Sequence, residues 1–187
     1  MPTPAGHAIA GVAAAFFANA TARRPRLTKP ILVSAAVLAV LPDLDIVAGL
    51  HRTQAHSIAA IAVVGLAAWI VLRRRVPDAL PLALALAAAF GSHALLDLLG
   101  KDTRFPRGLT VLWPLSSKYY ITGWDVFGEV SRRYWLPSEF ILGNLRALAW
   151  EMVLLVPVLL FAWAVWSGST LKGKRKKENG IEKRKKE

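Results

Sequence analysis

A chain of 187 residues that is 55% hydrophobic, with a mean hydropathy of +0.40, is too apolar for an ordinary soluble domain and is expected in a bilayer. The absence of cysteine excludes disulfides and thiolate metal sites, so any metal must be held by nitrogen and oxygen ligands, which favours zinc, manganese, iron or magnesium. The net charge of +12 does not indicate a nucleic-acid partner, because residues 172–187 carry nine Lys and Arg against three Glu and so hold half of the excess.

The first apolar run covers residues 8–20 and is followed by basic residues, among them Arg23 and Arg26. A cleaved signal peptide is the alternative, since Ala20-Thr21-Ala22 resembles a small-residue cleavage site. The positive residues of a signal peptide precede its apolar run, whereas here residues 1–7 contain no Lys or Arg. The pattern therefore favours a retained first helix.

Four further apolar segments follow, at residues 31–50, 57–72, 80–99 and 138–166. Pro42 removes a backbone donor and clashes with the preceding turn, so the second segment should kink near Leu41. Ser57 is a suitable N-cap for the third segment, and Gly100 should end the fourth. Pro157 interrupts the last. The segment at residues 31–50 is about long enough for a membrane crossing, for which about 20 apolar residues are needed, whereas those at 8–20 and 57–72 are short.

Residues 101–136 differ from the rest of the chain, because they hold all three tyrosines together with Trp113, Trp124 and Trp135. Tyr and Trp favour the headgroup level of a bilayer, so we expect this aromatic-rich loop to form an interfacial cap. The tail, residues 172–187, is low in complexity and is predicted to be disordered. The predicted fold is thus an all-α, polytopic membrane helix bundle of about five segments over residues 1–171, followed by a disordered polybasic tail.

Alternation of five segments places the loops 21–30 and 73–79 and the tail on one side of the membrane. These stretches hold 16 of the 24 Lys and Arg of the chain. Basic residues concentrate on the cytoplasmic side, so we expect the N-terminus and the aromatic-rich loop to face outward. The predicted location is the cell inner membrane, with several crossings and a cytoplasmic tail.

Most of the ionisable residues of the apolar segments fall at their outer ends. A buried carboxylate is costly unless something pairs with it, and a divalent cation would also explain the nearby histidines. His93 and Asp97 are four residues apart and share one helical face. Asp43 and Asp45 point apart on a regular helix, so either the backbone is irregular there or only one of them is a ligand. The candidate metal ligands are His7, Asp43, Asp45, His51, His56, His93 and Asp97.

Each of these residues also has a structural explanation. A lone intramembrane histidine such as His7 often makes a helix-packing hydrogen bond, and Asp43 and Asp45 could form a capped turn. Glu151 is either a catalytic base or the partner of Arg52 or Arg146. Arg52 is either that partner or a clamp for an anion, because its planar guanidinium suits phosphate.

The combination of motifs resembles the YdjM-like group of predicted inner-membrane, metal-dependent hydrolases. The resemblance runs from His7 to about Glu151 and is carried by Leu41-Pro42-Asp43-Leu44-Asp45, His51-Arg52-x3-His56-Ser57, Ser92-His93-x2-Leu95-Leu96-Asp97 and Leu112-Trp113-Pro114-Leu115-Ser116. It implies hydrolase activity without naming a substrate.

The leading hypothesis is a hydrolase in which a divalent metal ion, zinc before manganese, iron or magnesium, activates water. Asp45 or Glu151 would act as general base and Arg52 as anion clamp. Membrane lipids are the expected partners, and a phosphoester in a lipid headgroup is the first substrate class to consider, with an amide or carboxylic ester as alternatives.

The rival hypotheses are a metal or proton transporter and a non-catalytic protein with a structural polar cluster. A transporter should carry polar residues into the cytoplasmic halves of the segments, which here are almost purely Ala, Leu, Val and Ile.

Overall fold

The computed structural model describes residues 2–22, 26–48, 52–103, 105–131 and 134–184, with side chains left out at 46–48 and 173–184. This part of the chain is all-helical, as the sequence predicts, and contains no strand. Its α-helices are α1 (Pro4–Ala20), α2 (Lys29–Val40), α3 (Ile58–Leu72), α4 (Ala79–Leu99) and α5 (Pro137–Arg184), and two 3-10 helices, η1 (Leu41–Ala48) and η2 (Gln54–His56), lie between α2 and α3.

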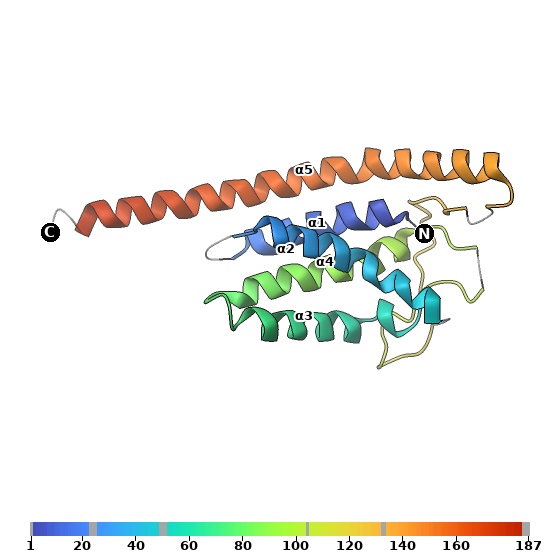
Figure 1. The fold of residues 1–187 in the computed structure, drawn as a ribbon, viewed down its shortest axis with the longest axis horizontal. Coiled ribbons are helices and arrows are strands. Elements are labelled where there is room, and N and C mark those ends of the chain that lie inside the picture. The colour runs from blue at the N-terminus through green and yellow to red at the C-terminus, as the bar shows by residue number, and fades with distance from the viewer. Residues whose placement is uncertain (1, 23–25, 49–51, 104, 132–133, 185–187) are drawn as a thin grey trace.

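Successive helices run in opposite directions along a common axis (Figure 1). The N-terminus, η1, η2 and the aromatic-rich loop therefore share one end of the bundle, and the α1–α2 and α3–α4 connections share the other. Helix α1 packs against α2, α4 and α5, while α3 packs against α4. The alternation agrees with the order of segments that the sequence predicts.

Local chemistry sets the helix boundaries near the shared end. The Thr3 side chain caps α1 by accepting a hydrogen bond from Gly6 N at 3.1 Å, directly before Pro4. Helix α2 ends at Val40 and continues as the 3-10 helix η1, where Pro42 predicts a kink. Ser57 caps α3 by accepting from Ala60 N at 3.2 Å, and Gly100 ends α4, both as predicted.

The core is built largely of small residues. Ala15, Ala35, Ala85 and Ala89 are fully buried and pack with Leu86. A side chain at Gly11 would overlap the methyl group of Ala39 and lie 3.0 Å from the carbonyl oxygen of Ala35, so α1 and α2 approach with almost no side chain between them. Helix α1 also packs along α4, and His7 near the start of α1 lies beside Asp97 near the end of α4.

Among the described residues, two helical stretches are long and apolar enough to cross a membrane on their own, Ala79–Leu99 and Pro137–Lys172. Helix α3 is apolar but shorter, and the 12 residues of α2 rise only about 18 Å, against a hydrocarbon core of about 30 Å. The described chain therefore has five α-helices of unequal length, of which two are long and apolar enough for a crossing, and the predicted set of about five crossings stays a prediction. The predicted segment at residues 31–50 is only partly α-helical, because α2 ends at Val40 and the chain continues as η1.

Helix α5 departs from the prediction at two points. Pro157 lies inside it and is exposed, so the helix is not interrupted there. The helix also extends past Trp166 to Arg184, and the structure therefore differs from the predicted disordered tail over residues 172–184. The tail is rich in Lys, Arg and Glu, which are good helix formers, so its backbone can continue the helix that precedes it.

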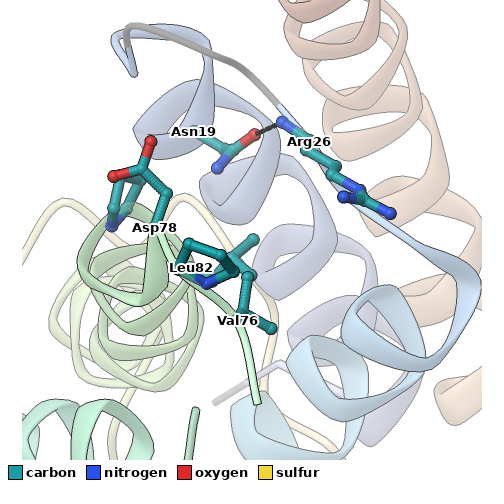
Figure 2. A pocket seen from close by; sticks show the side chains of 7 residues that line it. Asn19, Arg26, Val76, Asp78 and Leu82 are labelled. Atoms are coloured by element: carbon teal, nitrogen blue, oxygen red, sulfur yellow. Dashed lines mark hydrogen bonds between the residues drawn. The ribbon is translucent and has the colours of Figure 1, made fainter. Parts of the chain in front are cut away.

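At the end of the bundle opposite the N-terminus, the two connections surround a cavity of about 400 Å³ (Figure 2). Asn19 and Arg26 lie on one side of it, and Asp78 and Leu82 on the other. Asn19 is buried, and its Oδ1 accepts from Arg26 N at 2.8 Å and from Trp166 Nε1 at 3.1 Å. Asn19 thus ties the start of α2 and the later part of α5 to α1.

Candidate metal centre

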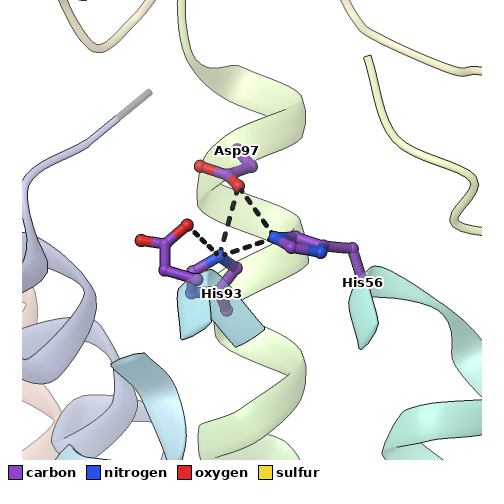
Figure 3. Close-up of side chains that lie close together, drawn as sticks. His56, His93 and Asp97 are labelled. Atoms are coloured by element: carbon purple, nitrogen blue, oxygen red, sulfur yellow. Dashed lines mark hydrogen bonds and ion pairs between the residues drawn. The ribbon is translucent and has the colours of Figure 1, made fainter. Parts of the chain in front are cut away.

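A cluster of ionisable side chains is buried at the end of the bundle that holds the N-terminus. His56 from η2 and His93 and Asp97 from α4 are almost completely buried and point toward one another (Figure 3). His93 Nε2 lies 3.1 Å from His56 Nε2 and 3.2 Å from Asp97 Oδ2. His56 Nε2 lies 3.7 Å from the same Asp97 oxygen.

Asp43 of η1 completes this group, with its Oδ1 at 3.6 Å from His93 Nε2. One ligand atom from each of the four residues lies within 4.8 Å of the others, which gives two nitrogens and two oxygens around a common point. Asp43 has 24% of its side chain exposed, against at most 1% for the other three. The cluster therefore opens on the side of Asp43.

The contacts of Nδ1 in His93 and in His56, on the sides of the rings that point away from the cluster, indicate which ring nitrogens face it. His93 Nδ1 lies 2.7 Å from the carbonyl oxygen of Ala39, which can only accept, so Nδ1 donates and Nε2 of a neutral ring keeps its lone pair. His56 Nδ1 lies 3.3 Å from Asp45 Oδ2, an arrangement that favours a proton on that nitrogen. A carboxylate or carbonyl behind a histidine in this way also orients metal ligands.

Two lone pairs and two carboxylates facing one point repel one another unless a cation lies between them. A proton would satisfy one pair of atoms, whereas a metal ion would satisfy all four. Neither oxygen of Asp97 has a hydrogen-bond partner among the described residues, although both are buried. The nitrogen and oxygen donor set suits zinc, and also manganese or iron.

His7 of α1 adds a third imidazole, stacked on His93 with ring centroids 3.9 Å apart and an interplanar angle of 15°. Its Nε2 lies 3.4 Å from Asp97 Oδ1. Of the seven ligands suggested by the sequence, the structure thus brings six together: His7, Asp43, Asp45, His56, His93 and Asp97. His51 lies outside the described residues.

The irregular backbone of η1 explains how both aspartates of one short stretch reach the cluster. Asp43 and Asp45 are two residues apart and would point in different directions on a regular α-helix. In η1, Asp43 approaches His93, and Asp45 approaches the outer nitrogen of His56. The backbone is thus irregular, as one possibility required, but only Asp43 is among the four residues whose ligand atoms lie together, and Asp45 lies behind His56 in the outer position of the other possibility.

Arg52 is buried and forms an ion pair with Asp102, whose Oδ2 lies 2.7 Å from Arg52 Nη1. The same oxygen accepts a hydrogen bond from Gly108 N at 2.8 Å, and the carbonyl of Arg52 accepts from Thr110 N at 3.2 Å. Arg52 has a left-handed backbone, with φ of 68°, which is uncommon for a residue with a side chain. Arg52 therefore joins the aromatic-rich loop to the segment before η2.

Asp102 is not among the site residues predicted from the sequence. A charged residue just after the end of a helix resembles a solvated loop position, and its partner lies 50 residues away. Arg52 was expected to bind an anion or Glu151. The ion pair with Asp102 instead gives its guanidinium a structural partner.

We expect Arg52→Ala and Asp102→Ala to destabilise the protein similarly, by about 3 to 5 kcal/mol each, because either change leaves a buried charge without its partner. Thermal unfolding in detergent would measure this, with Arg107→Ala, at an exposed site of the same loop, as the control. An Arg52→Ala variant with normal thermal stability and only a raised KM would indicate an anion clamp instead.

Glu151 is fully buried on α5, but it contacts the start of α1 instead of the cluster. One carboxylate oxygen accepts from Thr3 N at 2.7 Å, and the other accepts from the Thr3 hydroxyl. The expected pairing of Glu151 with Arg52 or Arg146 is not found among the described contacts. A role as general base is also disfavoured, since Thr3 occupies both oxygens. Thr3 itself was recognisable as an N-cap, because it precedes Pro4 at the start of an apolar run.

Comparison with known proteins identifies the family of the chain. A search of curated proteins and a search of solved structures give no match. A family model described as YdjM inner membrane protein matches residues 1–172, which include every residue of the cluster and both apolar stretches long enough to cross a membrane. The chain therefore belongs to the YdjM inner membrane protein family.

Proposed function

We propose that this protein is a membrane-bound, metal-dependent hydrolase whose metal ion is held by Asp43, His56, His93 and Asp97. The observation that carries the proposal is the convergence of two imidazole nitrogens and two carboxylates on one buried point. The apolar helices and the family match support the membrane location.

A divalent ion at this point would supply a bound water with its pKa lowered toward about 7, and so hydroxide at neutral pH. The chain's own residues hold this site in place. Ala39 fixes the ring of His93, and Asp45 lies behind the ring of His56. Asp45 therefore has a positioning role, while the partly exposed Asp43 lies where water and substrate enter.

An apolar groove of about 380 Å³ supports a lipid phosphoester as the substrate class. It is lined by Ala8, Ala36, Val37, Val40, Leu41 and Leu44. Ala8 follows His7 in the sequence, and Leu44 lies between Asp43 and Asp45, so the groove lies at the end of the bundle that holds the cluster. An acyl chain in the groove would place a headgroup at Asp43. A carboxylic ester or amide of a lipid would fit the same arrangement.

The structure offers less support for a transporter. Between the cluster and the cavity at the other end of the bundle, the core consists of Ala15, Ala35, Ala85, Leu86 and Ala89. The buried polar side chains of the described residues lie at the two ends of the bundle, with Asn19 at one end and Ser92 and His93 at the other. A transported ion would therefore have to cross an apolar layer after leaving His93.

For the topology, we propose that the cluster faces away from the cytoplasm. The connections at the opposite end, together with the tail, hold 16 of the 24 Lys and Arg. Exposed Trp124, Tyr134 and Trp135 at the end of the cluster suit a membrane interface. The substrates would then be lipids of the outer leaflet or extracytoplasmic esters.

The test is hydrolysis by the purified protein in detergent, before and after removal of metal with a chelator. Phosphomonoesters, phosphodiesters and lipid phosphoesters would be compared. We expect activity that is lost on chelation and restored by zinc or manganese, and that is strongest on a substrate with an acyl chain. A protein that binds metal but hydrolyses no member of the panel, nor a lipid ester or amide, would contradict the proposal.

A further inference from the structure

We infer that the cluster holds two metal ions, and that Asp97 bridges them. The first ion is the one in the proposed function, on which this inference rests. The second would lie between Asp97 Oδ1 and His7 Nε2, with water or substrate oxygens as its remaining ligands. This is a distinct position, because His7 is not among the four residues that surround the first point.

The starting observation is the state of His7. Its side chain is fully buried in α1, and neither of its ring nitrogens has a hydrogen-bond partner among the described residues. Buried polar atoms are nearly always hydrogen-bonded, and one that is not calls for an explanation such as an ion. A histidine that served only to join helices would donate or accept an aligned hydrogen bond, which His7 does not.

The second observation is the way in which Asp97 divides its two oxygens. Oδ2 faces His93 Nε2 at 3.2 Å, whereas Oδ1 faces His7 Nε2 at 3.4 Å. Each of these contacts is longer than a good charge-assisted hydrogen bond, which measures about 2.7 to 2.9 Å. One carboxylate therefore presents a separate oxygen to each of two imidazoles.

The spacing of the two rings sets the distance between the ion positions. His7 and His93 are nearly parallel, with centroids 3.9 Å apart. Ions bound at corresponding nitrogens of two such rings would be separated by a similar distance, and two-metal hydrolytic sites hold their ions about 3.5 to 4 Å apart. The stacking of the two rings and the separate oxygens that Asp97 presents to them are thus both compatible with two neighbouring ion positions.

A pair of ions would suit the phosphoester substrate of the proposed function. Two-metal sites stabilise the attacking and leaving oxygens of an in-line displacement at phosphorus. Two-metal sites also cleave amides in aminopeptidases, so the hydrolysis panel includes a lipid amide beside the phosphoesters.

The experiment counts ions per chain by elemental analysis after the purified protein is loaded with zinc, or separately with manganese, and desalted. The wild-type chain should retain two ions. His7→Phe keeps an aromatic ring against His93 but removes both nitrogens, and it should retain one. His7→Ala serves as a second variant, and circular dichroism confirms that each protein is folded.

With manganese, the electron paramagnetic resonance spectrum should show two coupled ions in the wild type and one isolated ion in His7→Phe. A single ion in the wild type, or two ions in His7→Phe, would overturn the inference. One ion together with hydrolysis would overturn only the second position and leave the proposed function standing. Two coupled ions without hydrolysis of any ester would support the second position and contradict the proposed function.

Discussion

Replacing Asp97 by asparagine is expected to remove bound metal and to lower hydrolysis by more than about a hundredfold. Asp97 contributes one oxygen toward His56 and His93 and the other toward His7, so it contacts more histidines of the cluster than Asp43 or Asp45 does in the contacts described above. Loss of an outer partner of a metal ligand already costs about 10- to 100-fold in affinity or activity. Loss of the Asp97 carboxylate, which faces the histidines directly, should therefore reduce metal affinity and activity by more than that range.

The matched control is Asp78→Asn, which makes the same chemical change at an exposed residue of the opposite end. It should keep the metal content and activity of the wild type. Metal analysis and the hydrolysis assay would be run on both variants after their folding has been checked. Full metal occupancy in Asp97→Asn would remove the site described above.

The orientation of the cluster should give an all-or-none result in intact cells. The chain contains no cysteine, so a cysteine placed at Lys118, in the aromatic-rich loop, or at Asp78, between α3 and α4, is the only target for a thiol reagent. Both positions are exposed. We expect a membrane-impermeant reagent to label Lys118→Cys and to leave Asp78→Cys unlabelled until the cells are lysed.

The reason for this expectation is the distribution of basic residues, which concentrate on the cytoplasmic side of membrane proteins. The result decides which substrates can reach the cluster. Labelling of Asp78→Cys but not Lys118→Cys in intact cells would place the site in the cytoplasm. Outer-leaflet lipids would then be excluded as substrates.

The parts of the fold that follow from local chemistry could be predicted from the sequence. Pro42 removes a backbone donor at the point where α2 changes to η1, and Ser57 and Gly100 provide a cap and a stop without reference to the rest of the chain. The pairing of His93 with Asp97 follows from their four-residue spacing. The alternation of the segments predicts, without further information, that η1 and η2 lie near His93 and Asp97.

The contacts between distant parts of the chain could not be predicted in the same way. Glu151 is 148 residues from Thr3, and Arg52 is 50 residues from Asp102, so neither partner leaves a periodic signal. From the sequence, Glu151 is a candidate general base and Arg52 a candidate anion clamp, because both stand out as charges near apolar segments. Packing of α5 on α1 and of the loop on η2 determines their actual partners.

X-ray absorption at the zinc edge tests the central claim most directly, because it reports the atoms around the ion in the purified wild-type protein. After zinc loading and desalting, we predict a first shell of nitrogen and oxygen at about 2.0 to 2.1 Å, with the outer-shell scattering that imidazole rings produce. Zinc that is lost on desalting, or a shell of oxygen without imidazole, would contradict a metal centre at His56, His93 and Asp97.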